Sequence, residues 1–533
     1  MMDLQIHETF DKKPGKLYRW QEECLKIWEQ NEYRGIVSAV TGAGKSRLAM
    51  AAIVRMRKIW PSLYVKVVVP TIPLAGQWMH ALIQEALCEE ERPGLIGGGY
   101  HEQDSRRIQI YIINSARKKL ASSVRAELAQ GRQVLLICDE CHHYLSKENK
   151  GIFDFLNTGH MISAEWFSGK YASLGLSATP FSEEQQEFPF QALGKVIYQY
   201  RFSQAVCENV VSPCILCNIS VSFIHEEKRN YDELSEQIRV VLGRLYQKYR
   251  YLKNADLSKQ AFLREINRLA ASTEMDPYDP ATKFLLLTYQ RKQICVLAQA
   301  RIRCCVDLID RLKPCDRILV FTEQISQAED VAFQLRREFG AGVGIYHSKM
   351  TKESRRRVLD GFRNHFYRIL VTCRCLDEGL DVPDANIAIV MSGSSVPRQR
   401  IQRLGRVLRK AEGKDAACLY YLYIREASED NVYLQTEIPD HQIFDLRYHA
   451  EEREFENELY LYAVRQIMEQ CRVLGRPEKQ LRELRRCALE GLVRHDYLLP
   501  DSQIGEKNIS AKTQHERNYW LTAQRLGRIM LEK

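Results

Sequence analysis

Short, almost uninterrupted apolar runs dominate this 533-residue sequence and occur in two series. Val, Ile and Leu fill whole runs instead of alternating with polar residues, which is typical of strands buried on both faces. Helical patterns separate successive runs, as in parallel sheets covered by helices. The sequence therefore predicts two tandem α/β domains. Their expected strands lie at 35–40, 65–70, 108–113, 133–138 and 172–179, then at 317–322, 342–347, 368–373 and 386–391.

The remaining segments divide the chain further. Apolar residues recur at helical spacing in 231–252 and 283–312, with a Pro-rich acidic loop at 274–282 between them. A similar helical pattern covers 455–474, where no strand-like runs are found. We predict four regions: a first α/β domain at 1–222, a helical insertion at 223–316, a second α/β domain at 317–435, and a helical accessory region at 436–533.

Composition and charge indicate the class of protein but not its substrate. The chain is 45% hydrophobic and 27% charged, with a net charge of +9 that suits a polyanionic partner and also many proteins without one. No apolar stretch approaches the roughly 20 residues that span a bilayer, so we expect a cytoplasmic protein without a membrane partner. Many of the 16 cysteines lie in apolar runs, which favours reduced, buried thiols.

A glycine-rich segment follows the first predicted strand and opens a helix. Gly42, Ala43 and Gly44 can curl backbone N–H groups around phosphate oxygens, with Thr41 at the start of the turn. In this P-loop pattern Lys45 reaches the β and γ phosphates and the Ser46 hydroxyl can ligate Mg²⁺. Ala39 replaces the first glycine of the strict pattern and leaves the later turn intact. The segment predicts an ATP site.

An acidic pair ends the strand expected at 133–138. Asp139 is a candidate ligand of Mg²⁺, and Glu140 is a candidate for orienting the attacking water. Acidic residues also end many strands simply as solvated surface. The position of this pair, on a buried strand downstream of the phosphate loop, favours catalysis.

Two groups of cysteine and histidine residues raise the question of a metal. Cys214 and Cys217 have C-x-x-C spacing, but no second pair with ligand spacing follows, and the segment has the pattern of a strand. The cluster Cys141–His142–His143 directly follows the acidic pair. We predict that neither group is a zinc site.

These segments, taken in order, resemble the motifs of superfamily 2 helicases and translocases. In the first α/β domain, 41–46 resembles motif I, 70–78 motif Ia, 139–142 motif II and 177–179 motif III. In the second, 320–324 resembles motif IV and 376–383 motif V. Residues Gln402, Arg403, Gly405, Arg406 and Arg409 fit motif VI. The resemblance implies two RecA-like domains that bind ATP and Mg²⁺ and act on nucleic acid.

The resemblance also implies roles for single residues. Gln21 matches the glutamine that reads adenine, and Gly379 and Asp381 match residues near the nucleotide in motif V. Gln402, Arg406 and Arg409 would complete the ATP site from the second domain, although a basic helix that binds nucleic acid is a competing account. The implied backbone contacts and coupling residues, several of which also suit caps or turns, are Thr71, Gln77, Ser115, Ser177, Thr179, Thr322, His347 and Ser348.

Within the superfamily, the segments at 70–78, 95–99 and 376–383 look more like DNA translocases of the xeroderma pigmentosum B type and restriction-enzyme motors than like DEAD-box RNA helicases. We expect an ATP-dependent DNA helicase or translocase acting on duplex or branched DNA, in bacterial defence or repair. The alternative is an ATP-gated DNA or RNA sensor that recruits an effector without unwinding. The basic C-terminal region is the candidate surface for such an effector, or a solvated helical face.

Overall fold

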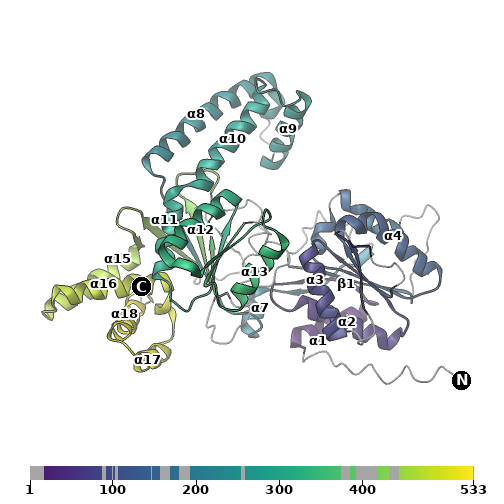
Figure 1. The fold of residues 1–533 in the computed structure, drawn as a ribbon, viewed down its shortest axis with the longest axis horizontal. Helices are drawn as coiled ribbons and strands as arrows, with labels where there is room; N and C mark the ends of the chain where they lie inside the picture. Colours follow the sequence, from purple (N-terminus) through teal and green to yellow (C-terminus); the bar gives the residue numbers. More distant parts are fainter. Residues whose placement is uncertain are drawn as a thin grey trace.

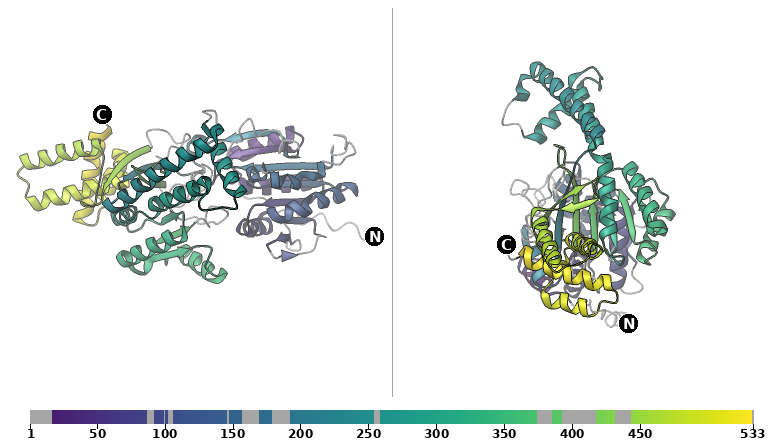
Figure 2. Two further views of the ribbon diagram at one scale, coloured as in Figure 1. Left: turned by 90° about the horizontal axis from the view of Figure 1, so that it is seen from above. Right: turned by 90° about the vertical axis from the view of Figure 1, so that its left-hand side faces the viewer.

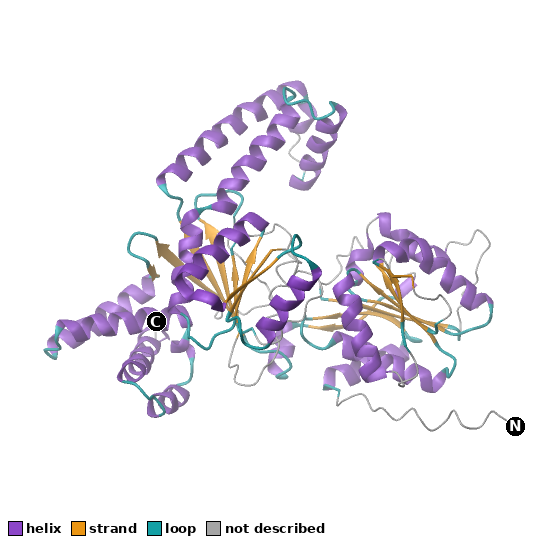
Figure 3. Cartoon of the chain, in the orientation of Figure 1, coloured by secondary structure: helices purple, strands orange, loops and turns teal. Residues whose placement is uncertain are grey.

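The computed structural model describes residues 17–86, 92–98, 100–101, 106–145, 147–156, 169–178, 192–253, 258–373, 385–391, 417–430 and 443–531. Two mainly parallel sheets, each covered by helices on both faces, confirm the predicted tandem RecA-like architecture (Figures 1 and 3). Across the described residues, no helix combines the length and apolar character needed to cross a bilayer.

The first sheet has the strand order β4-β3-β5-β2-β6-β7-β1-β8. Its strands are parallel except for the β3–β4 pair at one edge. Every residue of β5, β6 and β7 is buried, as the continuous apolar runs predict. The strands are β1 (Arg34–Ala39), β2 (Tyr64–Val69), β3 (Gly94–Gly97), β4 (Tyr100–His101), β5 (Ile108–Ile112), β6 (Val134–Cys138), β7 (Tyr171–Ser177) and β8 (Val196–Tyr200).

Helices and short helical turns connect these strands. Because parallel strands need crossover connections, most links include a helix. The α-helices are α1 (Arg19–Gln30), α2 (Lys45–Ile59), α3 (Ile72–Ala81), α4 (Ile113–Ala129) and α7 (Phe202–Cys207). The chain also forms a π-helical turn, η1 (Leu82–Ala86), and two 3₁₀-helical segments, η2 (Cys141–Leu145) and η3 (Lys147–Leu156).

The second sheet has the strand order β11-β12-β10-β13-β14-β9-β15-β16 and includes a strand that immediately precedes the helical insertion. β9 (Cys214–Val221) pairs in parallel with β14 and β15. The domain boundary predicted at residue 222 therefore places β9 in the wrong domain, because long-range pairing and not local pattern decides which sheet a strand joins. The other strands are β10 (Ile318–Thr322), β11 (Val343–Tyr346), β12 (Ile369–Cys373), β13 (Ile387–Val390) and β14 (Ala417–Ile424).

The same sheet also extends into the region predicted to be helical from residue 436. β15 (Ile443–His449) pairs with β9, and β16 (Glu454–Glu456) pairs antiparallel with β15. This part of the prediction is wrong. β15 is an edge-proximal strand of mixed burial, and it lacks the continuous apolar run by which the other strands were recognised.

The helical insertion forms an arm that projects away from the second sheet (Figures 1 and 2). It consists of α8 (His225–Lys248), α9 (Lys259–Ser272) and α10 (Pro280–Leu297), with a separate apolar cluster that includes Ile238, Leu245 and Phe284. The helical conformation is interrupted at Ala298. The next helix, α11 (Gln299–Arg311), packs in the core of the second domain instead of in the arm. The insertion is thus shorter than the predicted 223–316.

The C-terminal helices pack onto the second domain. They are α15 (Glu458–Val473), α16 (Glu478–Arg494), α17 (Asp501–Ile509) and α18 (Gln514–Leu531), and they lie on the far side of the second sheet from the first (Figure 1). Ile467, Leu492 and Leu526 belong to the same apolar cluster as the strands of that sheet. The domain also contains α12 (Ile325–Phe339) and α13 (Lys352–Arg363).

Cysteines in the described part of the chain are free, and most are buried, as the sequence predicts. Cys214 and Cys217 stand three positions apart on β9, so their side chains point to opposite faces of the sheet. Each thiol belongs to a different apolar cluster. This geometry rules out one metal ion held by both.

Candidate nucleotide-binding site

The predicted phosphate loop lies at the carboxyl edge of the first sheet. β1 ends at Ala39, and α2 begins at Lys45, so the loop faces the N-terminal end of a 15-residue helix. The backbone N–H groups and dipole of such a helix end favour anions. Gly42 and Gly44 have φ values of 88° and 93°, which glycine adopts without strain.

Gly44 also has no room for a side chain. A Cβ atom at this position would lie 2.9 Å from Nε2 of Gln21. The fully buried Gln21 donates from Nε2 to the Gly44 carbonyl at 2.9 Å, and its Oε1 accepts from the Tyr18 amide at 2.9 Å. Gln21 therefore holds the backbone of the phosphate loop. Reading adenine, the role implied by resemblance, would require its amide to exchange these partners.

Lys45 is buried and folds back on the end of β1. Its Nζ donates to the Ala39 carbonyl at 3.0 Å. The ammonium is near enough to Asp139 to favour the charged form of that carboxyl and to oppose the rise in its pKa. The Lys45 ammonium and the acidic pair Asp139–Glu140 thus lie at the same edge of the sheet.

Asp139 directly follows β6, whose neighbours in the sheet are β2 and β7. Its Oδ2 accepts a hydrogen bond from Nε1 of Trp78 at 2.8 Å, and its Oδ1 accepts from the Glu140 amide at 3.0 Å. Burial and, to a lesser extent, the charge of Glu140 raise the pKa of Asp139 to about 6, although the Trp78 hydrogen bond and the Lys45 charge act in the opposite direction. This carboxylate is desolvated and oriented.

Glu140 turns the chain out of the strand. Its φ of 47° lies in the left-handed region, which non-glycine residues rarely adopt and which recurs at functional sites. Oε2 of Glu140 lies 3.4 Å from Nδ1 of His142, and the same Nδ1 lies 3.1 Å from Oγ of Ser177 at the end of β7. His142 thus joins the acidic pair to the segment that resembles motif III.

Cys141 takes no part in this group of polar side chains. Its thiol is buried in the apolar cluster beneath the site, and burial raises the pKa of the Cys141 thiol well above its ordinary value. Gly175 on β7 gives it space, since a Cβ there would lie 3.3 Å from Cys141 Sγ. Cys141 and His142 therefore point to different surroundings.

Two residues at the site were not recognised from the sequence. Trp78, on α3, is 2% exposed and bonds Asp139, and the hydroxyl of Tyr144 donates to the carbonyls of Asp139 and Val68 at 2.7 and 2.9 Å. Both are aromatic residues in apolar surroundings, so the sequence gives no sign of their polar contacts. Trp78 lies in the segment that resembles motif Ia, and this position was the one sequence feature that could have indicated a role at the site.

The predicted nucleic-acid residues differ in their surroundings. Thr71 is the N-cap residue that precedes α3 and makes no side-chain capping hydrogen bond, and Gln77 lies on that helix, half-buried. Ser115 packs against Gly97, where a Cβ would lie 2.7 Å from its hydroxyl. These three residues belong to the first domain and follow β2 or β5.

In the second domain, Thr322 is fully buried, and its hydroxyl donates a hydrogen bond to the Thr372 carbonyl at 3.1 Å. This hydroxyl therefore contacts the neighbouring strand of the sheet. His347 and Ser348 follow β11, with His347 buried and Ser348 exposed. Thus only Ser348 of these three presents an exposed side chain. The predicted residues that lie outside the described part of the chain are Thr179, Gly379, Asp381, Gln402, Arg406 and Arg409.

Comparisons with known proteins agree with this architecture. The family described as "Type III restriction enzyme, res subunit" matches residues 15–182, and the family described as "Helicase conserved C-terminal domain" matches residues 300–411. The chain is 30% identical over 416 residues to DNA 3'-5' translocase XPB2 of Sulfurisphaera tokodaii, covering 78% of this chain and 83% of that protein.

More distant similarities extend over comparable lengths. The chain is 22% identical over 461 residues to putative helicase 22 of a Sulfolobus islandicus filamentous virus, covering 80% of this chain and 71% of that protein. The structure of the restriction-modification enzyme LlaBIII bound to DNA is similar in fold, with a TM-score of 0.51 and 14% identity. The match covers 97% of this chain and 40% of that one.

The two RecA-like domains and the family matches define a nucleic-acid-dependent ATPase of the helicase class. Within that class, the chain belongs to superfamily 2, in the group of xeroderma pigmentosum B-like translocases and restriction-enzyme motor subunits.

Proposed function

We propose that this chain is an ATP-dependent DNA helicase or translocase that remodels duplex or branched DNA. The observation that carries the proposal is the convergence, at the carboxyl edge of the first sheet, of the phosphate loop at the start of α2 with the Asp139–Glu140 pair after β6. DNA is proposed over RNA because the relative XPB2 is named as a DNA translocase.

Features of the described residues fit a nucleotide with Mg²⁺. Gln21 lies too close to Gly44 for a side chain at that position. The loop therefore presents backbone atoms, which form a cradle for phosphate at the N-terminus of α2. Thr41 Oγ1 is buried and has no hydrogen-bond partner within the described part of the chain, and the buried Glu140 Oε2 lies 3.4 Å from His142 Nδ1. Buried polar atoms without partners are costly unless a ligand or water satisfies them.

Each residue of the site has a proposed task. The loop amides and Lys45 bind and orient the phosphates, while Ser46 and Asp139 hold the cation. When bound, ATP would supply the transferable phosphoryl group, and Mg²⁺ would neutralise part of the negative charge on the phosphates. Glu140 positions the attacking water and accepts its proton at a carboxylate oxygen. Trp78 keeps Asp139 in the orientation needed to meet the cation.

We further propose that the second domain completes the site through Gln402, Arg406 and Arg409, with Gly379 and Asp381 close to the nucleotide. An arginine brought to the phosphates from another domain couples hydrolysis to domain closure. In the first domain, the hydrogen bond between His142 and Ser177 is the contact that we propose links the acidic pair to the segment resembling motif III, and so takes part in that coupling. The backbone of DNA would contact Thr71, Gln77, Ser115 and Ser348.

We propose an effector protein as an additional partner, bound through the C-terminal helices in a defence or repair system. Support comes from large apolar side chains exposed there, with Val473 and Ile509 83% and 86% exposed. Co-purification with neighbouring gene products before and after Val473→Ser and Ile509→Ser tests this surface. Retention of every partner by the double variant would contradict it.

Steady-state ATP hydrolysis with different polymers tests the main proposal. The full chain is assayed with no polymer, single-stranded DNA, duplex DNA, forked DNA and duplex RNA, alongside Lys45→Ala as the inactive reference. We expect the strongest stimulation from duplex or forked DNA. Stimulation by RNA alone would replace the DNA proposal with an RNA-dependent one.

A further inference from the structure

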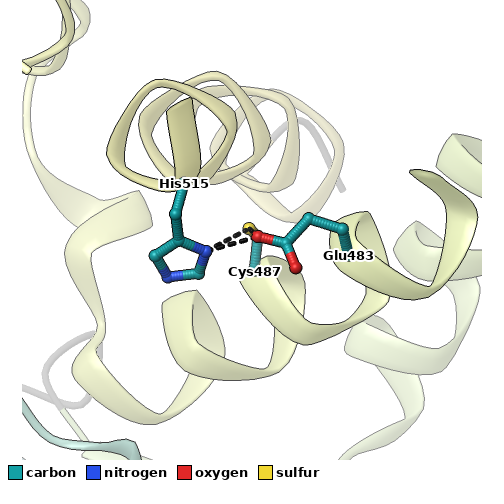
Figure 4. A group of neighbouring side chains, drawn as sticks. All are labelled: Glu483, Cys487 and His515. Atoms are coloured by element: carbon teal, nitrogen blue, oxygen red, sulfur yellow. Dashed lines mark hydrogen bonds and ion pairs between the residues drawn. The ribbon is translucent and has the colours of Figure 1, made fainter. Parts of the chain in front are cut away.

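Three potential metal ligands of different chemistry meet in the C-terminal region, far along the chain from the nucleotide site. Glu483 and Cys487 stand one turn apart on α16, and His515 lies in the first turn of α18 (Figure 4). α16 and α18 pack against each other, so the three side chains point toward one another between the two helices (Figure 4).

The spacing of the three ligand atoms suits a single ion. Sγ of Cys487 lies 3.9 Å from Nδ1 of His515 and 4.0 Å from Oε1 of Glu483, and all three atoms lie within 4.8 Å of one another. With tetrahedral zinc bond lengths, such atoms stand about 3.5 Å apart. Nδ1 and Oε1 share a hydrogen bond, and a cation would take the place of its proton.

A fourth residue supports the imidazole from behind. Oε2 of Glu490, a buried side chain on α16, lies 3.4 Å from Nε2 of His515. Arg486 and Arg494 hold this carboxylate at 3.0 and 3.1 Å. Histidine ligands of metals commonly donate their second ring N–H to such a carboxylate, which fixes the tautomer that leaves the first nitrogen free to bind.

A hydrogen-bonded His–Glu pair without metal is the competing account. It explains the contact of His515 with Glu483 but does not explain why Sγ of Cys487 lies within reach of both Nδ1 of His515 and Oε1 of Glu483. Mixed sulfur, nitrogen and oxygen donors select zinc-like ions over Mg²⁺.

We propose that Glu483, Cys487 and His515 form a binding site for Zn²⁺ or a similar transition-metal ion, oriented by Glu490, that clamps α16 to α18. His515 and Glu483 are 37% and 32% exposed, so water can supply the fourth ligand. Since the clamp would join residues 487 and 515, it would stabilise the intervening α17 and the start of α18.

Titration of the chelator-treated full chain with Co²⁺, which reports thiolate ligation by a charge-transfer absorption band, tests the site. We expect about one Co²⁺ per chain with a thiolate band, displaced by Zn²⁺. Cys487→Ser abolishes the band, and Glu490→Gln weakens binding by about 10- to 100-fold. The exposed cysteines Cys207 and Cys315 provide matched controls, because their serine variants should retain the band.

Circular dichroism and ATP hydrolysis confirm that each variant is folded. If Cys487→Ser fails to fold, His515→Asn replaces it, because that side chain is partly exposed. No thiolate band in the native chain, or a band that survives in folded Cys487→Ser and His515→Asn, would overturn the proposal. A band lost only in the Cys207 or Cys315 variant would also overturn it.

Discussion

The indole nitrogen of Trp78 donates a hydrogen bond to the Asp139 carboxylate at 2.8 Å, which joins the helix after β2 to the acidic pair after β6. The two strands are neighbours in the sheet, so the contact is set by the parallel topology. It favours the charged form of a buried carboxyl whose pKa burial raises to about 6. A cation ligand needs that charged form.

Replacing Trp78 should therefore change the requirement for Mg²⁺. Trp78→Phe removes the donor and keeps most of the apolar ring, and a hydrogen bond to a charged group is worth about 1.5–3 kcal/mol. We expect the Mg²⁺ concentration for half-maximal ATP hydrolysis to rise by about 10-fold. Trp60→Phe, at the position directly after the C-terminal end of α2, is the control. Equal Mg²⁺ curves for both variants would refute the role of Trp78.

The bond between His142 and Ser177 predicts a specific loss of coupling. Ser177→Ala removes a partner worth about 0.5–1.5 kcal/mol. We expect DNA-stimulated hydrolysis to fall by about 3- to 10-fold, with the rate in the absence of DNA less affected. Ser173→Ala is a matched control on the same strand, because that hydroxyl bonds the Leu193 carbonyl instead. An equal effect of both variants on stimulation would count against coupling.

The phosphate loop should not tolerate a side chain at Gly44. Gly44→Ala meets both a φ of 93° and a Cβ position 2.9 Å from Gln21. We expect a loss of about 1–3 kcal/mol in the free energy of unfolding and weaker ATP binding by calorimetry. Gly76→Ala on α3 is the control, since nothing lies within 4 Å of its Cβ position. Normal ATP affinity in Gly44→Ala would contradict the proposed cradle.

His495 predicts how stability depends on pH. Burial lowers the pKa of His495 to about 3, so between about pH 3 and 6.5 the unfolded chain binds a proton at this ring that the folded chain excludes. Stability from this group is complete above pH 6.5 and is lost as the pH falls. From pH 7 to 5 the loss is about 2 kcal/mol.

His495→Asn removes the titrating ring and suits the left-handed backbone, whose φ is 57°. Denaturant unfolding at pH 7 and pH 5 should therefore show a smaller loss for this variant than for the native chain. His225→Asn, at an exposed position on α8, should behave like the native chain. An unchanged pH dependence in His495→Asn would show that the ring titrates normally.

Local sequence patterns predicted the strands around the site because each pattern reports its own burial. The runs ending at Ala39, Cys138 and Ser177 are fully or almost fully buried strands, and the glycines after β1 adopt the expected left-handed conformation. The place of β9 in the second sheet could not be predicted in this way. Its partners, β14 and β15, lie about two hundred residues away, and their pairing depends on the whole fold.

The contacts of the polar side chains were also beyond local patterns. Gln21 was matched by its position in a motif, yet its amide bonds the loop backbone, and Trp78 has the pattern of an ordinary core residue. Thr322 is the last residue of a predicted strand, as expected, but its hydroxyl bonds within the sheet. Position along a strand fixes where a residue lies, whereas packing decides which atom it contacts.

Displacement of a third strand from duplex DNA tests the central claim most directly, because only movement along the duplex removes it. The full chain, with Glu140→Gln as the hydrolysis-deficient variant, is incubated with a triplex and ATP. We predict displacement by the native chain with ATP and at least about 100-fold slower displacement by Glu140→Gln. ATP hydrolysis stimulated by duplex DNA without any displacement of the third strand would contradict translocation and would instead identify an ATP-gated sensor.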